Sequence, residues 1–200
     1  RNLSQITAAW QEFYKNQYEL ESIENAYDAK KPIIKARKNH KIVRMALSKN
    51  ERYIAYVDQR FSRYKLYIYD TKEDKRKRIL TRGYRIAQNT DYSYPLMAWH
   101  PNNKLLAFFI EEKGVINLGF YNLEDKELQL KEFYRFDKIL SFEYSKDGKQ
   151  FLLSAIKNGQ SDIFTYTILN TKVQQITNDD YDDLEPSFFD NDKRIAWSSN

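Results

Sequence analysis

The chain has 200 residues and no cysteine, which excludes disulfide bonds, thiol catalysis and zinc sites with cysteine ligands. Its five glycines are too scattered for a phosphate-binding loop, and no apolar run is long enough to span a bilayer. The net charge of +5 combines a basic first half, with 21 Lys and Arg against 10 Asp and Glu in residues 1–90, and an acidic second half, with 12 against 18.

The chain begins with a predicted α-helix over residues 4–30. Ser4 is the expected N-cap, and Pro32 cannot continue the helix. Apolar side chains fall mostly at steps of three and four residues, which places them on one stripe. They are Ile6, Ala9, Trp10, Phe13, Leu20, Ile23 and Tyr27. Acidic residues are interleaved through the helix, so we expect the stripe to pack on protein rather than on a membrane. Residues 31–41 follow as a basic linker.

From residue 42 onward one sequence motif recurs, in which a polar turn joins two apolar strands. It occurs at Leu96–Ile110, Ile139–Ile156 and Pro186–Ser199, with a weaker copy at Arg44–Val57. The large apolar residue before each turn is Leu47, Trp99, Tyr144 or Phe188, at successive spacings of 52, 45 and 44 residues. A fixed period of this size predicts a repeat architecture.

Each repeat contains four apolar runs joined by short turns. In the third repeat the runs are 139–144, 151–156, 162–169 and 172–176. Asp147-Gly148 and Asn158-Gly159 tolerate positive φ and favour tight hairpins. A four-stranded antiparallel meander cannot bury both of its faces alone, and radial stacking of such sheets produces a β-propeller.

The predicted fold class is therefore all-β: four-stranded antiparallel blades of a β-propeller, preceded by an N-terminal α-helix. Residues 1–41 form the helix and basic linker, and residues 42–200 form three full blades and the start of a fourth. About four blades are the fewest that close a ring. We therefore expect the ring to be incomplete in this segment and to continue beyond it in a longer polypeptide.

The repeats resemble those of TolB-type propellers, whose motif reads roughly Pro-x-Trp/Phe-Ser-Pro-Asp-Gly-Lys-x-Ile-Ala-Phe. Residues 144–149 keep its Ser, Asp, Gly and Lys and lose its Pro, whereas residues 99–104 keep Trp, Pro and Lys. Residues 186–197 keep both flanks of the motif but depart from it in the turn. Leu80-Thr81 and Ile176-Thr177 match the Leu-Thr pair that closes blades in that family. The Gly-His and Trp-Asp pairs of WD-type repeats are absent.

The resemblance implies a setting as well as a fold. The helix, the basic linker and the composition rich in Lys, Asn and Tyr are similar to those of large TolB-like envelope proteins of Bacteroidetes-type bacteria. Such a relationship implies a periplasmic location near peptidoglycan or the inner face of the outer membrane. It also implies protein partners in an envelope complex and peripheral membrane association at most.

No catalytic constellation is evident in the sequence. His40 and His100 are the only histidines, and neither has a second histidine or a paired carboxylate at ligand spacing. We expect structural roles for both. Ser48, Ser145 and Ser187 lack the Gly-x-Ser-x-Gly context of a nucleophile elbow. The sequence therefore predicts no catalytic residue and no cofactor.

Two charged segments invite a functional interpretation. The segment Asn178–Glu185 could ligate calcium through oxygen donors, although it lacks the glycine and spacing of an EF-hand loop. Its carboxylates are Asp179, Asp180, Asp182, Asp183 and Glu185. A solvated interblade loop is the favoured alternative. The basic run Lys75–Arg78 falls on a predicted outer strand, where charge discourages edge pairing, and we favour that role over phosphate binding.

Repeat lengths locate a candidate protein-binding face. Thr81 and Trp99 are 18 residues apart, whereas the equivalent Thr177 and Phe188 are 11 apart, so the first interblade loop has seven extra residues. Loops tolerate insertions and carry binding sites, and Tyr and Arg are frequent interface hot spots. The candidates in this loop and the next are Arg82, Tyr84, Arg85, Tyr92, Tyr94, Phe133, Tyr134 and Arg135. Packing of these aromatic rings between blades is an equally weighted alternative.

Three functions remain open at this point. The leading prediction is a non-enzymatic, protein-binding scaffold in a bacterial envelope assembly. The first alternative is a propeller domain that gates a prolyl-oligopeptidase-like hydrolase, which a downstream Gly-x-Ser-x-Gly motif would favour. The weaker alternative is nucleic-acid binding by the basic half. We do not expect it, because the positive charge is spread over a helix, turns and strand edges rather than gathered in one groove.

Overall fold

The computed structural model describes residues 3–17, 32–84 and 91–200. The chain divides into two units, Arg1–Lys35 and Ala36–Asn200. The first unit contains helix α1 (Leu3–Gln17), and the rest of the predicted helix lies outside the described residues. Ile6, Trp10 and Phe13 are 51–65% exposed, so the described part of the apolar stripe has no cover. No described helix has the length and hydropathy that a membrane crossing requires.

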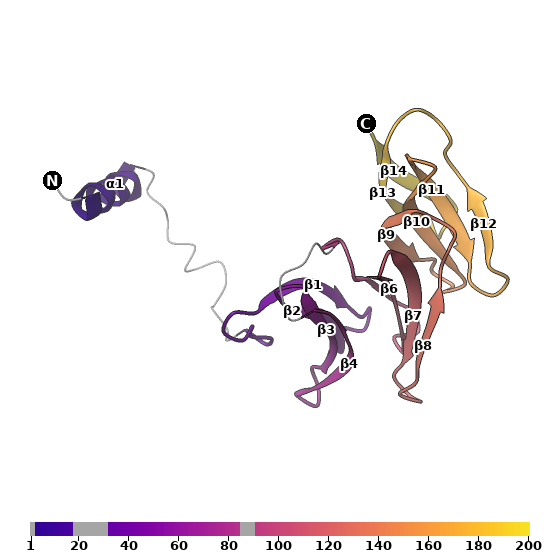
Figure 1. Ribbon diagram of the computed structural model, residues 1–200, viewed down its shortest axis with the longest axis horizontal. Helices are drawn as coiled ribbons and strands as arrows, with labels where there is room; N and C mark the ends of the chain where they lie inside the picture. The colour runs from indigo at the N-terminus through magenta and orange to yellow at the C-terminus, as the bar shows by residue number, and fades with distance from the viewer. Residues whose placement is uncertain (1–2, 18–31, 85–90) are drawn as a thin grey trace. The chain divides into compact units, whose positions relative to one another are not determined.

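The second unit contains four antiparallel sheets that follow one another along the chain (Figure 1). Blade 1 consists of β1 (Lys41–Leu47), β2 (Tyr53–Arg60), β3 (Arg63–Asp70) and β4 (Lys75–Gly83). Blade 2 consists of β5 (Leu96–Trp99), β6 (Leu105–Glu112), β7 (Val115–Asn122) and β8 (Leu128–Glu132). Blade 3 consists of β9 (Lys138–Tyr144), β10 (Gln150–Lys157), β11 (Gln160–Thr167) and β12 (Lys172–Gln175). A half-blade of β13 (Asp183–Phe189) and β14 (Arg194–Ser199) ends the unit.

This arrangement confirms the predicted fold class. Each full blade is a meander in which every strand pairs with the next, and the described sheets form no closed ring. The third repeat has its four strands where the four apolar runs predicted them. Residues 36–40 of the predicted linker belong to the second unit, so this unit begins before the first strand.

The turns of the recurring sequence motif share one hydrogen-bond pattern in the three full blades. The residue after the first strand of each full blade donates its N–H to the carbonyl five residues ahead, at 2.9 Å, and accepts from the N–H three residues ahead. These residues are Ser48, His100 and Ser145. The residue three ahead has positive φ in every case, and it is Glu51, Asn103 or Gly148. The repeat therefore conserves the backbone geometry of the turn even where its Asp-Gly pair is lost.

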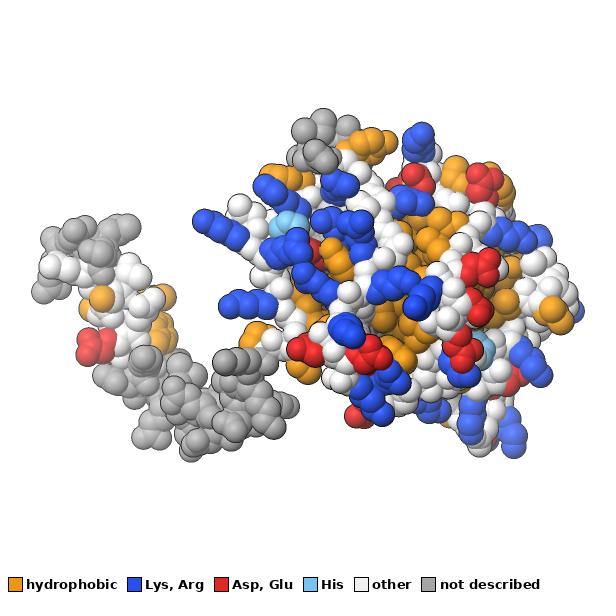
Figure 2. Space-filling view, turned by 90° about the horizontal axis from the view of Figure 1, so that it is seen from below, with side chains coloured by type: hydrophobic (Ala, Val, Ile, Leu, Met, Phe, Trp, Pro, Cys, Tyr) orange, Lys and Arg blue, Asp and Glu red, His pale blue; other side chains and the backbone are white. Residues whose placement is uncertain are grey.

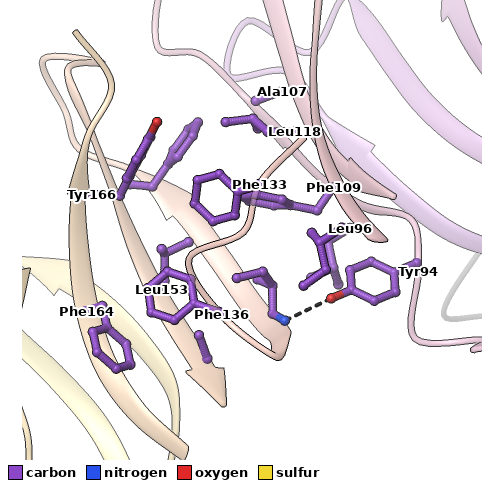
Figure 3. Packing of buried hydrophobic residues seen from close by; sticks show 14 residues of the cluster. Tyr94, Leu96, Ala107, Phe109, Leu118, Phe133, Phe136, Leu153, Phe164 and Tyr166 are labelled. Carbon is purple, nitrogen blue, oxygen red and sulfur yellow. Dashed lines mark hydrogen bonds between the residues drawn. The ribbon is translucent and has the colours of Figure 1, made fainter. Parts of the chain in front are cut away.

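The core lies between blades, in two apolar clusters. Phe108 of β6 faces blade 1, whereas the adjacent Phe109 faces blade 3, because successive side chains of a strand point to opposite faces. Both rings are fully buried, and each such burial contributes about 1.5–3 kcal/mol. Figure 3 shows Phe109, Phe133 and Tyr166 packed together between blades 2 and 3. The second strands of blades 2 and 3 are mostly apolar and buried, because both of their faces are covered.

Candidate protein-binding face

The strand order assigns every connection of the second unit to one of two faces. Strand direction alternates, so the β1–β2 and β3–β4 turns and their equivalents share one face, here called the hairpin-turn face. The opposite face carries the β2–β3 turns and the three interblade loops, whose described residues are 84, 91–95, 133–137 and 176–182. We call it the interblade-loop face. The described residues among those predicted to bind a partner lie in or beside these loops.

Exposed tyrosine is confined to the interblade-loop face among the described residues of the second unit. Tyr84 and Tyr92 lie in the first loop, Tyr134 in the second and Tyr181 in the third, with exposed fractions of 51, 57, 73 and 60%. Phe61 adds an exposed ring from the β2–β3 turn, with the Arg60 guanidinium 5.4 Å from its centroid. Exposed aromatic side chains are typical of interface cores, so this face has the composition of a binding surface.

Two of the predicted binding residues, Tyr94 and Phe133, are in fact core residues. Their exposed fractions are 6 and 5%, and the neighbouring Phe136 is equally buried. The Tyr94 hydroxyl accepts a hydrogen bond from the backbone N–H of Ile139 at 2.8 Å, which ties the first loop to blade 3 (Figure 3). Burial raises the pKa of Tyr94 to about 12. The packing alternative therefore holds for these side chains, which anchor the loops rather than contact a partner.

The other predicted residues have different environments. Arg82 is partly buried, and its Nε donates to Glu112 Oε2 at 3.1 Å while its Nη1 donates to the Thr81 carbonyl at 3.0 Å. Arg135 is exposed beside Tyr134, whose hydroxyl donates to Glu132. Arg85 lies outside the described residues.

A groove crosses the interblade-loop face between blades 1 and 2. Its volume is about 620 Å³, and Arg82 and Tyr84 line one side while Glu111, Glu112 and Lys113 line the other. Arg82 and Glu112 form an ion pair in this groove, and Tyr84 adds an exposed aromatic ring. The acidic side of the groove consists of the end of β6 and the turn that follows it. This turn has no extra residues, so a comparison of repeat lengths could not identify it as part of a site.

The acidic segment has structural hydrogen bonds. The pairs are Asp179 with the Tyr181 N–H at 3.0 Å, Asp182 with Ser161 Oγ at 2.5 Å and Asp183 Oδ1 with Trp197 Nε1 at 3.1 Å. Asp183 is fully buried, whereas Asp180 and Glu185 are exposed. In the part of the chain that the structure describes, no three His, Asp or Glu side chains are grouped to hold a metal ion.

The turn serines and the histidines have structural contacts. Ser48 Oγ donates to Asn50 and Ser145 Oγ to Asp147, both at 2.7 Å, so these hydroxyls stabilise turns. The His100 ring packs edge-on against Tyr144, with 5.0 Å between centroids. His40 contacts an acid instead, at a pocket described below.

The basic run lies on β4, the outer strand of blade 1, as the sequence predicts. Two of its side chains cover aromatic rings on opposite faces of that blade. The Arg76 guanidinium lies 5.5 Å from the centroid of Tyr67, and Lys77 Nζ lies 5.2 Å from that of Tyr121. These cations therefore have packing partners within the propeller.

No family model matches the chain, and no curated protein matches it. Several solved structures are similar to the chain. TolB from Acinetobacter baumannii is 21% identical, with a TM-score of 0.64 over 82% of this chain and 39% of that one. A TolB described as putative, from Agrobacterium tumefaciens, is 15% identical, with a TM-score of 0.60 over 78% of this chain and 53% of that one. A prolyl endopeptidase structure is 10% identical, with a TM-score of 0.56 over 78% of this chain and 24% of that one.

At these identities the likeness concerns the fold alone. The chain spans 39% and 53% of the length of the two TolB chains. Propellers of TolB proteins and of peptidases are both among the similar structures, so fold likeness does not choose between a binding domain and a peptidase domain. Residues 36–200 form consecutive blades of a β-propeller whose fold is similar to that of TolB proteins.

Proposed function

We propose that this chain is part of a non-enzymatic scaffold whose propeller binds a protein partner through the interblade-loop face. The observation that carries the proposal is that the exposed tyrosines among the described residues of the second unit, four in number, all lie in the three loops of that face. A tyrosine gives a large, rigid contact area at low entropic cost and keeps a hydroxyl for hydrogen bonding. Core rings hold the second loop in place, so its exposed Tyr134 is presented by a fixed backbone.

The cellular setting is a further part of the proposal. Resemblance of the repeats to TolB-type propellers supports a bacterial envelope assembly, with the protein in the periplasm near peptidoglycan or the outer membrane. The partner is then another protein of that assembly. Fractionation of cells that produce the full-length protein tests the setting: recovery in the periplasmic fraction supports it, and recovery with cytoplasmic markers opposes it.

Site-specific photocrosslinking of the full-length protein tests the binding face. A photoreactive phenylalanine analogue replaces Tyr84, Tyr134 or Tyr181, one in each interblade loop, and cells are irradiated. We expect all three positions to give a covalent adduct with the same protein. Matched controls on the hairpin-turn face are Lys72, Lys126 and Leu169, also one in each blade and all exposed. A common adduct from the control positions, or none from the loops, would contradict the proposal.

The captured partner then allows a quantitative test. The triple variant Tyr84→Ala, Tyr134→Ala and Tyr181→Ala should weaken its binding by at least about 100-fold, because central aromatic contacts carry most interface energy. The melting temperature should be unchanged, since all three side chains are exposed. Unchanged affinity would eliminate this face as the binding site.

A hydrolase domain outside residues 1–200 is the second candidate, and likeness to a prolyl endopeptidase propeller favours it. It makes a different prediction for the full-length protein. A fluorophosphonate probe would label a nucleophilic serine in a hydrolase, whereas a scaffold would stay unlabelled and its sequence would lack Gly-x-Ser-x-Gly followed by Asp and His.

A further inference from the structure

Blade 1 contains a basic pocket that the repeat does not require. Its volume is about 400 Å³, within the range of small-molecule sites. It is lined by His40, Asp58, Arg60, Phe61, Arg63 and Lys65, and we call it the blade 1 pocket. Figure 2 shows Lys and Arg side chains gathered around a histidine over the part of the second unit where blade 1 lies.

Comparison of the three blades shows that this chemistry is specific to blade 1. Asp58 lies two residues before the end of its strand, where the equivalent strands have Ile110 and Ala155, both fully buried. The turn from Arg60 to Arg63 has two arginines, whereas each equivalent turn has a single lysine. A propeller blade can therefore form without the charges of this pocket.

A carboxylate fixes the histidine at the inner wall of the pocket. His40 Nδ1 lies 2.6 Å from Asp58 Oδ1, and the two side chains are only 13 and 6% exposed. Because the carboxylate engages Nδ1, the ring orientation is set and Nε2 is the nitrogen left for a ligand. Nε2 has no hydrogen-bond partner among the described residues.

The cations of the pocket are not neutralised. Within the described ranges, Arg60, Arg63 and Lys65 have no carboxylate within 4.0 Å. With Asp58 counted as −1 and His40 as neutral, the pocket has a net charge of +2. A phosphomonoester carries about −1.5 to −2 at neutral pH, and arginine binds phosphate through paired N–H groups.

We propose that the blade 1 pocket binds a small phosphomonoester. Arg60, Arg63 and Lys65 contact the phosphate, His40 Nε2 completes the polar wall, and the ring of Phe61 packs against the organic body of the ligand. The Arg60 guanidinium already lies over that ring, which places charge and apolar surface side by side. The site does not depend on the proposed protein partner.

Calorimetry on the full-length protein tests the ligand class with three probes: phenyl phosphate, inorganic phosphate and benzoate. Phenyl phosphate should bind at least about tenfold more tightly than either of the others, because only it combines a dianion with a ring. Equal binding of benzoate would overturn the preference for phosphate. Equal binding of inorganic phosphate would overturn the role of Phe61, and no saturable heat from phenyl phosphate would overturn the site.

A matched pair of variants locates the binding. Arg60→Gln should weaken phenyl phosphate binding by about tenfold or more, whereas Lys157→Gln should not change it. Both residues end the second strand of their blade and both are exposed, so neither change should affect folding. Imidazole ¹⁵N signals, assigned with His40→Gln and His100→Gln, give a second readout. Phenyl phosphate should shift the His40 signals and leave those of His100 in place. A shift of the His100 signals alone would overturn the placement of the ligand in the blade 1 pocket.

Discussion

Tyr94 anchors the longest interblade loop through one hydrogen bond to buried backbone. Tyr94→Phe keeps the ring but leaves the Ile139 N–H without its partner, which should lower the free energy of unfolding by about 1–3 kcal/mol. Urea denaturation of the full-length protein measures the change. The control Tyr84→Phe removes a hydroxyl from an exposed ring and should have no effect. Equal stability of the two variants would show that water replaces the lost bond.

The same residue predicts a dependence on alkaline pH. Burial raises the pKa of Tyr94 to about 12 from its ordinary value of 10.0. A raised pKa in the folded state contributes stability that is complete below pH 10 and is lost as the pH rises toward 12. The stability difference between the wild-type protein and Tyr94→Phe should therefore narrow over this interval. A constant difference from pH 9 to 12 would show that Tyr94 ionises equally in both states.

At this scale the sequence predicted the loops but not the direction of each side chain. Tyr92 and Tyr94 are two residues apart, and one is exposed while the other is buried. Phe133 and Tyr134 are adjacent and differ in the same way. A strand has a period of two residues that tells its faces apart, but an irregular loop has none. The pairing of His40 with Asp58 was hidden for another reason, since only the fold brings residues 18 positions apart together.

The turns of the hairpin-turn face pack against their neighbours, and Gly148 permits one such contact. A Cβ at Gly148 would lie 2.0 Å from His100 Nε2 of the preceding blade, and its φ is +73°. Gly148→Ala should therefore destabilise the protein by about 1–3 kcal/mol more than Gly159→Ala does. Gly159 is the matched control, because its φ is +83° but no atom lies within 4 Å of its Cβ position.

Removal of His100 distinguishes the steric clash at Gly148 from the strain of a positive φ. His100→Ala alone should lower the stability, because it removes the hydrogen bond from the Asn102 N–H to His100 Nδ1 at 3.1 Å. In the Gly148→Ala background the same change should cost less, since it also removes the clash. Thermal melts of the full-length variants measure both changes, and an equal cost in the two backgrounds would show that the His100 contact is not the cause.

The positions of the strands were easier to predict from the sequence than the burial of individual loop side chains. Hydrophobic runs and Gly-containing turns predicted the strands of the third blade, and the repeat period extended this prediction to the other blades. The described part of the helix agrees with its apolar spacing, although its exposed stripe shows that spacing alone does not reveal what covers a face. The groove between blades 1 and 2 was not predictable, because it joins a loop of blade 1 to a turn of blade 2 that are about 30 residues apart.

At the scale of the whole molecule, the outermost sheets of the second unit have uncovered apolar side chains. Met45 and Leu47 of β1 are 65 and 56% exposed, and Phe189 and Trp197 of the half-blade are 46 and 43% exposed. The equivalents of the first pair are Met97 and Trp99, which pack against blade 1, and Trp99 Nε1 donates to the Ala46 carbonyl at 3.0 Å. A further blade would cover these apolar side chains in the same way, and the blade 1 pocket would then lie at the interblade-loop end of that interface.

Residues 1–200 produced alone should consequently self-associate, because exposed sheet faces of this kind drive aggregation. Light scattering after size-exclusion chromatography should show oligomers at micromolar concentration. The double variant Met45→Gln and Leu47→Gln should reduce their size, since it removes apolar surface from one face. Leu169→Gln is the control, because Leu169 is 95% exposed but lies in a turn, away from the sheet faces. A monodisperse fragment that melts cooperatively would show that these faces need no neighbouring blade.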